Sequence, residues 1–438
     1  MNKINKVAIF GMGKSGKSAL KLAKKHRQDF YAVNKGDPKT WWAEENLKDI
    51  CGTCACSSEE EFAGHFDKMD EIIISPGIPT THPALKKAVE KGVPIISEIE
   101  YAYRYVKDIP VIAITGTNGK TTTTTMIAEA LTLSGKKVFC GGNIGVPYCD
   151  LALSEEKVDF SVIEVSSFQL ETIKDFHPRI GLILNISPNH SERYDEVIDY
   201  ARAKFRLLNN MTAQDHVILG TENPYLDEVK NHPAQKSYFS KGSLPESFKK
   251  QFDFSKSRVK GEHNEANFFA TYEVLRLLGV DNLDSFFQKF IESFSGVAHR
   301  LEFVLEKDGL SVYNDAKSTN ALATTTAIKA FKESKSPLYL ILGGKLRNES
   351  DKFLPDLLPY KDMVHKIFTI GEVTERLYLE LRDHFDVEKA GDLKTVFQKV
   401  KGLEGNLVFS PGFPSFDQFK NYVDRGEKFK ICAKESLL

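Results

Sequence analysis

Two glycine-rich stretches of the 438-residue chain have the composition of loops that bind phosphate groups. The first, GMGKSGKS from Gly11 to Ser18, matches in full the P-loop pattern GxxxxGK followed by Ser or Thr, and its first part matches the dinucleotide pattern GxGxxG. The second, GTNGKT from Gly116 to Thr121, lacks the first glycine of the strict pattern, because Ile114 stands in its place. The letters alone therefore favour the first loop.

The surrounding sequence favours the second loop. A dinucleotide site needs an acidic residue at the end of the next strand to hold the ribose, but the strand DFYAVN ends at Asn34, so NAD is not expected. The first loop is then a tight strand-to-helix turn whose backbone N–H groups can still hold a phosphate of some ligand. The second loop lies between the strand VIAIT and a threonine-rich helix start. There Lys120 can reach terminal phosphates, and the Thr121 hydroxyl can bind magnesium.

Further candidates for phosphoryl transfer follow at the ends of predicted strands. Glu164 ends the strand FSVIEV, and Asn189 and His190 follow the strand ILNI. Because the carboxyl ends of parallel strands meet at one edge of a sheet, these side chains should point into the crevice where ligands bind. These residues also have structural interpretations: Glu164 can simply end a strand, and His190 can be a turn residue. Lys204, which follows on a predicted amphipathic helix, can likewise be a solvated lysine.

The elements that must position these residues form a repeating pattern. Short β-branched runs alternate with longer helical patterns along the whole chain, which is typical of βαβ units and parallel sheets. The pattern restarts after Asp108-Ile109-Pro110 and again after Phe294-Ser295-Gly296. We therefore predict an α/β protein of three consecutive domains: a Rossmann-like domain at 1–108, a central P-loop ATPase-like parallel sheet domain at 109–296, and a Rossmann-like C-terminal domain at 297–438.

Composition excludes several classes of function. The 59 Lys and Arg residues nearly balance the 60 Asp and Glu residues, which argues against disorder and against broad nucleic-acid binding. The N-terminal apolar run VAIF is too short for a signal peptide, and no stretch approaches the roughly 18 apolar residues of a membrane helix, so a cytoplasmic protein without membrane insertion is expected. Six cysteines do not suggest a disulfide framework; the group Cys51, Cys54 and Cys56 invites a metal interpretation, but thiols are the default.

Ten short segments resemble one family when they are taken together. They are TGTNGKTTTT, GGNIGVP, EVSSFQLE, NISPNHSERY, YARAKF, GEHNEAN, GVAHRLE, NDAKSTN, LGGK and SPGFPSFDQFKNYVDRG. In order and spacing they resemble the Mur ligase family, in particular the members that add D-glutamate, from about residue 70 to 430. The ending SFDQF favours these members over those that add a diamino acid, whose DNPR-like motif is absent from the sequence.

The resemblance implies an ATP-dependent carbon–nitrogen ligase that makes a peptidoglycan precursor. The substrates would be UDP-N-acetylmuramoyl-L-alanine, held by the N-terminal domain, and D-glutamate, brought by the C-terminal domain. The L-alanine carboxylate would attack the γ-phosphate of ATP to give an acyl phosphate, which the amine of D-glutamate would displace. The resemblance also implies two Mg²⁺ ions and a carbamate formed by carbon dioxide on Lys204, an oxygen donor that suits a hard cation. We expect a monomer.

The family's functional residues are carried over only where motifs match. The implied catalytic residues are Lys120, Glu164, His190, Lys204, Arg300 and Lys317. The implied ATP contacts are Gly116, Thr117, Asn118, Gly119, Lys120, Thr121, Thr122, Asn264, Asn267, Arg300 and Asp315. The implied substrate contacts are Ser75, Gly77, Ile78, Asn143, Ser166, Gln169, Thr319, Arg347, Ser415 and Tyr422. The implied metal ligands are Thr121, Glu164, His190 and Lys204.

The sequence departs from the family's pattern mainly around the substrates. Asn189 replaces the usual aspartate before the histidine, and Asn34 replaces an acidic residue at the end of the second strand. Lys345 and Arg347 stand where an aspartate and a lysine usually follow LGG. Two alternatives stay open: another Mur-type ligase with a different acceptor, of a recycling or folylpolyglutamate-like kind, and a nucleotide-binding relative without catalysis. A P-loop GTPase is disfavoured because no NKxD-like guanine motif is suitably placed.

Overall fold

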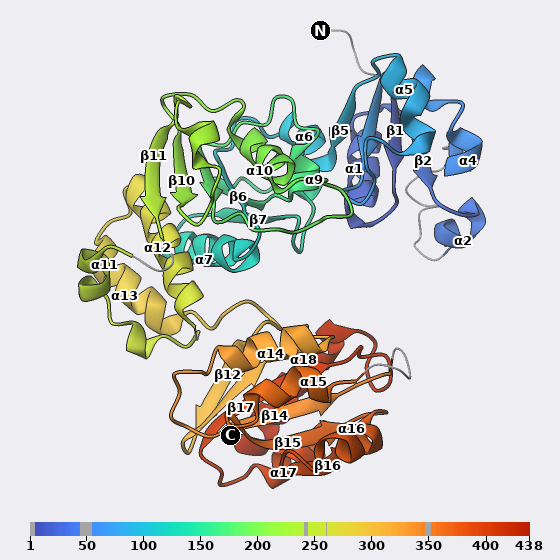
Figure 1. Cartoon of the computed structure of the whole chain (residues 1–438). Coiled ribbons are helices and arrows are strands. Elements are labelled where there is room, and N and C mark those ends of the chain that lie inside the picture. Colours follow the sequence, from blue (N-terminus) through green and yellow to red (C-terminus); the bar gives the residue numbers. More distant parts are fainter. Residues whose placement is uncertain (1–4, 44–54, 241–243, 260, 347–351) are drawn as a thin grey trace. The chain divides into compact units, whose positions relative to one another are not determined.

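The computed structural model describes residues 5–43, 55–240, 244–259, 261–346 and 352–438 (Figure 1). The chain divides into two compact units, residues 1–248 with 266–283 and residues 249–265 with 284–438. Three sheets account for the strands of the described residues, one in each predicted segment. The α/β class and the three-sheet organisation predicted from the sequence are confirmed, while the boundaries near 109 and 297 stay a prediction.

The N-terminal sheet is parallel throughout and has the strand order of a Rossmann sheet around its central strand. Its strands across the sheet are β3 (Ala55–Ser58), β2 (Asp29–Asn34), β1 (Lys6–Phe10), β4 (Glu71–Ile74) and β5 (Ile95–Ser97). Its helices are α1 (Lys14–Lys25), α2 (Pro38–Ala43), α4 (Glu59–Phe62), η1 (Phe66–Lys68), η2 (Pro83–Leu85), α5 (Lys86–Glu90) and α6 (Glu98–Tyr103). Alternate residues of β1 bury opposite faces: Val7 and Ile9 join the core with α1, and Ala8 and Phe10 join the core with α4 and α5.

The central sheet carries the second glycine loop and is also parallel. Its strands across the sheet are β11 (Gln235–Phe239), β10 (His216–Gly220), β9 (Ile180–Ile183), β6 (Val111–Thr115), β8 (Phe160–Glu164) and β7 (Val138–Gly142). Its helices are α7 (Lys120–Leu133), α8 (Tyr148–Leu153), α9 (Ser167–Leu170), α10 (Val197–Phe205), η3 (Arg206–Leu208) and η4 (Leu226–Val229). Helices α11 (Glu246–Gln251) and α12 (Glu262–Leu277) each cross the division between the two compact units, and η5 (Phe254–Lys256) and nearly all of α13 (Leu283–Ser293) belong to the second unit. Because β6 lies between β8 and β9, the loops after these three strands meet at one edge of the sheet.

The C-terminal sheet is parallel except at one edge. Its strands across the sheet are β12 (Glu302–Lys307), β13 (Leu310–Asn314), β17 (Gly405–Gly412), β14 (Leu338–Gly343), β15 (Val364–Ile370) and β16 (Val387–Gly391). Its helices are α14 (Ala321–Lys329), α15 (Leu354–Leu357), η6 (Leu358–Tyr360), α16 (Thr374–Leu381), α17 (Leu393–Lys399) and α18 (Tyr422–Leu437). Alternate residues of β14 again bury two faces, with Ile341 in the core beneath α17 and α18 and Leu340 in the core beneath α15 and α16.

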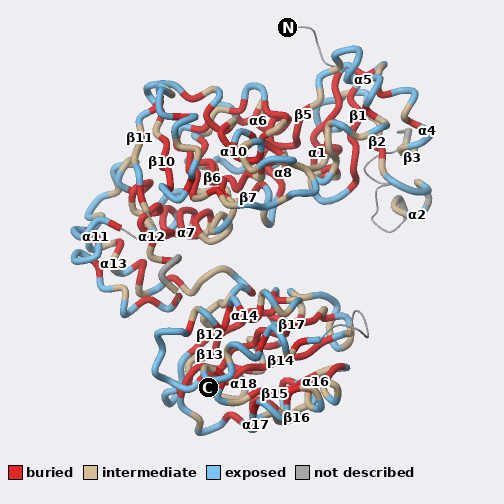
Figure 2. The backbone as a smooth tube through the Cα atoms, in the orientation of Figure 1, coloured by how far each residue is buried: buried red, intermediate tan, exposed pale blue. Residues whose placement is uncertain are grey.

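One apolar core joins the N-terminal and central sheets within the first compact unit. Helices α6 and α8 pack against each other, and α1 packs on α8. Val7 and Leu20 from the N-terminal side belong to the same buried cluster as Tyr148 and Ile163 from the central side. Figure 2 shows this burial running along the strands and the facing sides of the helices. No helix among the described residues is long and apolar enough to cross a membrane.

Two local features differ from the sequence-based expectation. The helical pattern from Pro83 to Lys91 predicts one continuous helix, whereas the structure has a 3-10 turn, η2, followed by the short α5. The antiparallel strand β12 was not predicted. It pairs with β13 through a two-residue turn in which Asp308 and Gly309 both have positive φ, +49° and +82°. An Asp-Gly pair between β-branched runs is a hairpin signal, so the sequence did contain the information.

Candidate active site

The second glycine loop connects β6 to α7 in a conformation that needs its glycines. Gly116 has φ +151° and Gly119, the residue before α7, has φ +82°. A Cβ at Gly116 would lie 3.1 Å from the Cβ of Leu184, and one at Gly119 would lie 2.8 Å from Oδ1 of Asn267. The loop therefore fits closely between the segment after β9 and helix α12, and its helix starts at Lys120. Free N–H groups at such a helix start form an anion-binding site.

Hydrogen bonds from the segment after β9 fix the shape of this loop. The N–H groups of Thr117 and Asn118 donate to the backbone oxygen and to Oδ1 of Asn185, each at 2.9 Å. Nζ of Lys120 donates to the carbonyls of Gly116 and Thr117, both at 2.9 Å, so the ammonium lies over the loop. Thr122 follows in the first turn of α7 and is half-buried. The arrangement places one positive charge and several N–H groups around one point, which suits a polyphosphate.

Oxygen donors suited to magnesium lie beside the loop. Thr121 donates from Oγ1 to Oε2 of Glu164 at 2.8 Å, and Asn143 donates from Nδ2 to Oε1 of the same carboxylate at 2.8 Å. A hydroxyl and a carboxylate at the phosphate loop match the preference of Mg²⁺ for oxygen ligands. Among the described residues, no group of three or more His, Cys, Asp and Glu side chains could hold a metal. Cys51 and Cys54 lie outside those residues.

Lys204 is a buried lysine at the same edge of the sheet. It is 1% exposed, its Nζ lies 4.4 Å from the centre of the Tyr200 ring, and it donates to Oγ1 of Thr115 at 3.4 Å. Burial, with a smaller contribution from the positive charge of Lys120, lowers the pKa of the Lys204 amine to about 6. A neutral amine at neutral pH follows, which is the reactive form of a lysine.

His190 lies in the loop after β9, with a left-handed backbone at φ +57°. Its ring packs edge-on against Phe168 with 4.8 Å between ring centres and lies 5.8 Å from the ring of Tyr200. Its Nδ1 lies 2.9 Å from Oε1 of Glu192. His190 and Lys204 therefore both lie against Tyr200, the first residue of the motif YARAKF, which was not among the predicted site residues.

A buried polar network supports the His190 loop. Arg193 donates from Nε to Oε1 of Glu171 at 3.0 Å, and Tyr194 donates to the same oxygen at 2.6 Å. The guanidinium of Arg193 also lies 4.5 Å from the centre of the Phe168 ring. Glu171 belongs to the segment EVSSFQLE and Arg193 to NISPNHSERY, so two of the motifs are joined in space.

Four other predicted residues are buried or half-buried near the starts of α9 and α12. Ser166 and Gln169 form a capping box at α9, in which each side chain bonds the backbone N–H of the other. Nε2 of Gln169 is buried and has no hydrogen-bond partner among the residues that the structure describes. Asn264 and Asn267 are both buried near the start of α12, and Oδ1 of Asn267 accepts a bond from Thr123 at 3.2 Å.

The first glycine loop lies beside the predicted nucleotide-sugar residues of the N-terminal sheet. Ser75 donates from Oγ to the carbonyl of Gly11 at 2.9 Å, and a Cβ on Gly11 would lie 3.0 Å from Cδ1 of Ile78. Nothing lies within 4 Å of a Cβ built on Gly77. Oδ1 of Asn34 accepts the Met12 N–H at 3.3 Å. The loops after β1, β2 and β4 therefore meet at one edge of the sheet, where its strand order reverses.

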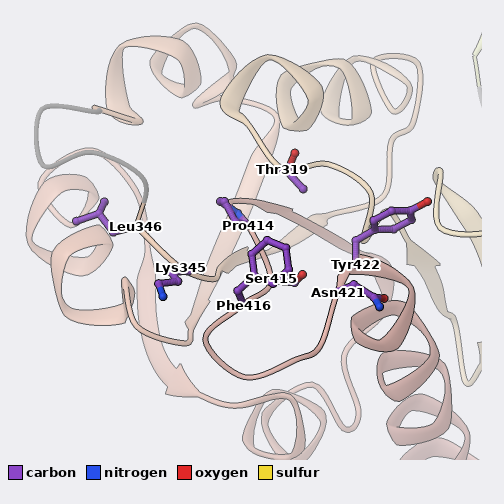
Figure 3. Close-up of a pocket in the computed structure, with 8 residues that line it drawn as sticks. All are labelled: Thr319, Lys345, Leu346, Pro414, Ser415, Phe416, Asn421 and Tyr422. Carbon is purple, nitrogen blue, oxygen red and sulfur yellow. The ribbon is translucent and has the colours of Figure 1, made fainter. Parts of the chain in front are cut away.

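The C-terminal sheet has a pocket of about 610 Å³ at the carboxyl ends of β13, β14 and β17 (Figure 3). Its lining residues are Thr319, Lys345, Leu346, Pro414, Ser415, Phe416, Asn421 and Tyr422. Three of them, Thr319, Ser415 and Tyr422, are the residues predicted to contact an amino acid. The structure adds Lys345 and Asn421; the Lys345 N–H bonds the Pro414 carbonyl at 2.8 Å, which joins two of the lining loops.

The predicted nucleotide contacts of this domain lie close to the pocket. Asp315 accepts bonds from the Leu301 N–H at 3.1 Å and from the hydroxyls of Ser318 and Ser410 at 2.5 and 2.7 Å. Burial raises the pKa of the Asp315 carboxyl to about 6. These bonds make Asp315 an anchor of the loop after β13.

The cations predicted in this domain are exposed. Lys317 lies with its Nζ 5.6 Å from the centre of the Tyr422 ring, and both Lys317 and Arg300 are open to solvent. Arg347 lies outside the described residues. Exposed cations next to a pocket can reach an anionic ligand without a large desolvation cost.

The described residues form three sheets with helices; the central sheet carries a glycine loop of phosphate-binding type, and the last sheet carries a pocket. This combination defines the class of the protein as a multidomain P-loop protein. The family model described as Mur ligase middle domain matches residues 114–284, and the model described as Mur ligase MurD-like, N-terminal domain, matches residues 5–97. The chain belongs to the Mur ligase family.

Relatives of known name agree with this membership. A UDP-N-acetylmuramoylalanine–D-glutamate ligase from Streptococcus uberis is 35% identical over 97% of this chain and 95% of its own length. One from Thermoanaerobacter pseudethanolicus is 33% identical over 98% of each chain. The solved structure of MurF from Acinetobacter baumannii shares the fold with a TM-score of 0.56 at 16% identity, over 93% of this chain and 91% of that one.

Proposed function

We propose that this chain is the ATP-dependent ligase that joins D-glutamate to UDP-N-acetylmuramoyl-L-alanine in peptidoglycan precursor synthesis. The observation that carries the proposal is the 35% identity to a ligase of that name over 97% of the chain. The site geometry supports it with a phosphate loop, a nearby set of oxygen donors and a separate pocket that suits a small amino acid.

In the proposed first step, the L-alanine carboxylate attacks the γ-phosphate of ATP, and ADP leaves. Lys120 and the N–H groups in the first turn of α7 would hold the phosphates and stabilise the charge on the transferring group. Mg²⁺ would be held by Thr121 and Glu164, whose oxygens lie 2.8 Å apart, and would neutralise part of that charge. The rate would therefore come mainly from positioning and electrostatics.

The second proposed metal position uses Lys204 and His190. The fit of the lysine rests on its burial and its lowered pKa, because carbon dioxide reacts with a neutral amine and gives an anionic oxygen donor. Asn189 lacks the charge of the family's usual aspartate, but its Oδ1 accepts the His190 N–H at 2.9 Å, a bond that an aspartate would also make. The loop shape is therefore compatible with the substitution, and the missing charge remains its main effect.

In the proposed second step, the amine of D-glutamate attacks the acyl phosphate carbon, loses a proton and releases phosphate. The hydroxyls of Thr319 and Ser415 and the ring of Tyr422 would orient the amino acid in the C-terminal pocket. Lys345 adds a positive charge to the lining, which suits a dicarboxylic acceptor. We further propose that the protein acts as a monomer in the cytoplasm, where ATP is made and where the thiols of Cys140 and Cys149 stay reduced.

Phosphate release tests the proposal directly. ATP, Mg²⁺ and UDP-N-acetylmuramoyl-L-alanine are mixed with the protein, and D-glutamate is added, omitted or replaced by L-glutamate and by other amino acids. Release that depends on D-glutamate is expected. Release with another acceptor would place the chain among the other ligases of the family, and no release in any mixture would favour a binding protein without catalysis.

A further inference from the structure

The wall of the C-terminal pocket is held from behind by buried polar groups. The segment 413–416 forms that wall, and it is fixed by two bonds to its carbonyls, from the Lys345 N–H to Pro414 and from Nη1 of Arg425 to Phe413, both at 2.8 Å. Arg425 is fully buried on α18, and its Nη2 donates to the carbonyl of Ala316 at 2.8 Å. The guanidinium therefore joins the loop after β17 to the loop after β13.

Asp417 follows this wall directly and reaches a third loop. Its Oδ2 accepts the N–H of Glu372, in the loop between β15 and α16, at 3.0 Å. The neighbouring Gly371 has φ +73°, and a Cβ built there would lie 2.1 Å from the same oxygen. The loop is thus shaped to receive the carboxylate, and only glycine leaves room for it.

The remaining atoms of this region indicate a charge interaction. Oδ1 of Asp417 and Nε of Arg425 are both buried and lack a hydrogen-bond partner among the described residues. Burial lowers the pKa of Arg425 to about 10, although the negative charges of Asp417 and, to a smaller extent, Asp315 act against that lowering. Because a buried charge is costly unless an opposite charge lies near, Asp417 stabilises the guanidinium that holds the wall.

We propose that Asp417 is a positioning residue for the acceptor pocket. This role rests on the proposed function in one respect, that the ligand of the pocket is an amino acid. Asp417 does not line the pocket. Ser415 and Phe416 do line the pocket. Asp417 would hold these two residues in place through its bond to the loop between β15 and α16 and through the guanidinium of Arg425. Its loss should therefore weaken binding of the acceptor and leave binding of ATP and of the nucleotide sugar unchanged.

The first test compares Asp417→Asn with Asp424→Asn. The asparagine retains an oxygen for the Glu372 N–H but removes the charge that faces Arg425. Asp424 offers a matched control, because it lies nearby in the first turn of α18 but is partly exposed and paired with Lys428. In steady-state phosphate release, Asp417→Asn should raise the KM for D-glutamate about tenfold or more and change the KM values of ATP and the nucleotide sugar less than about twofold. Asp424→Asn should match the wild type.

A second pair of variants approaches Asp417 from the opposite loop. Gly371→Ala and Gly402→Ala both replace a glycine of positive φ, +73° and +79°, but a Cβ at Gly402 meets nothing within 4 Å. Backbone strain is therefore shared, and contact with Asp417 is not. Gly371→Ala should raise the KM for D-glutamate as Asp417→Asn does, and Gly402→Ala should not. This pair also decides the matter if Asp417→Asn fails to fold.

The proposal is overturned if the KM values of all three substrates rise together, if only thermal stability falls, or if Gly371→Ala and Gly402→Ala behave alike. The wild type separates this failure from failure of the proposed function. If it releases phosphate with another amino acid instead of D-glutamate, the proposed acceptor is wrong, and the same variants are measured with the acceptor that is used. If the wild type releases no phosphate, binding of radiolabelled D-glutamate is measured in place of the KM. The role of Asp417 is then rejected if the wild type does not bind D-glutamate, or if Asp417→Asn binds it as well as the wild type does.

Discussion

The two glycine-rich loops end in similar residues but lie in different structural environments. Both end in glycine, lysine and a hydroxyl residue, and in both the hydroxyl donates to a carboxylate: Ser18 to Asp150, and Thr121 to Glu164. In the first loop the hydrogen bond joins α1 to α8 and is buried, with Ser18 3% exposed. In the second loop the bond lies beside the phosphate loop itself. The same pair of groups thus packs two helices together in one place and lies beside the proposed magnesium site in the other.

The position of the helix start explains this difference. Helix α1 begins at Lys14, so Gly16, Lys17 and Ser18 already lie inside the helix, and a Cβ on Gly16 would lie 1.8 Å from the Gly11 carbonyl oxygen. Helix α7 begins at Lys120, so its lysine and hydroxyl occupy the first turn. Only the first turn of a helix has free N–H groups that can bind an anion. A match to the phosphate-loop pattern therefore indicates a phosphate site only where the helix also begins at the lysine of the pattern.

Substitution of the two lysines gives the largest expected effect. Lys120→Ala removes the charge that lies over the phosphate loop and should lower turnover by about three orders of magnitude, whereas Lys17→Ala should leave ATP turnover nearly intact. The measurement is phosphate release at saturating substrates, with circular dichroism to check that both variants are folded. A large loss in Lys17→Ala with little loss in Lys120→Ala would mean that the catalytic loop is the first one.

Lys204 gives the next largest effect, because the second loop should use this residue and the first loop has no counterpart of it. Lys204→Ala should lower turnover about a hundredfold through loss of a metal ligand, and an added short carboxylic acid should restore part of it by replacing the carbamate. Arg202→Ala is the control, since Arg202 lies on the same helix but is exposed and paired with Glu228. Loss of activity without any recovery would remove the support for a carbamate.

The site could be predicted where its residues follow strands that end at one edge of a sheet. The structure brings Thr121 and Glu164 together, as the strand pattern predicted, because β6 and β8 are neighbours and their ends meet. Tyr200 and Lys345 lie within the motifs YARAKF and LGGK but were not among the predicted site residues, because a motif does not show which of its side chains face the site.

Other local patterns were available and were not used. The capping box of Ser166 and Gln169 has a Ser-x-x-Gln spacing that predicts a helix start, and the Asp308-Gly309 turn predicts the hairpin to β12. The parallel strand pattern, in contrast, was strong enough to give all three sheets, because buried β-branched runs alternate regularly with helices.

The two hydroxyl–carboxylate pairs provide a sharper comparison with smaller effects. Thr121→Val should lower turnover about tenfold, because it removes an oxygen ligand of the metal, and should leave the melting temperature nearly unchanged. Ser18→Ala should leave turnover unchanged and lower stability by about 1 to 3 kcal/mol, because Asp150 loses a buried partner. Thermal unfolding and phosphate release are measured on both variants. Equal effects of the two substitutions on turnover would show that the two loops do not differ in role.

The smallest effect on activity is expected at Glu98, a buried residue of α6 next to the first loop's packing site. Its Oε1 accepts the Cys149 N–H at 2.5 Å, its Oε2 has no hydrogen-bond partner among the described residues, and it is 1% exposed. Burial raises the pKa of the Glu98 carboxyl from 4.5 to about 7, with a smaller contribution from the charge of Asp150. Because the folded protein favours the protonated form, stability falls as pH rises from about 4.5 through about 7.

Glu98→Gln retains the oxygen for the Cys149 N–H and removes the charge that becomes unfavourable at high pH. The variant should be more stable than the wild type at pH 8 by up to about 3 kcal/mol and should differ much less at pH 5, with turnover unchanged at both. Thermal unfolding at the two pH values measures this. A stability difference between the variant and the wild type that is the same at both pH values would contradict this prediction. It would mean that burial between α1, α6 and α8 does not raise the pKa of Glu98.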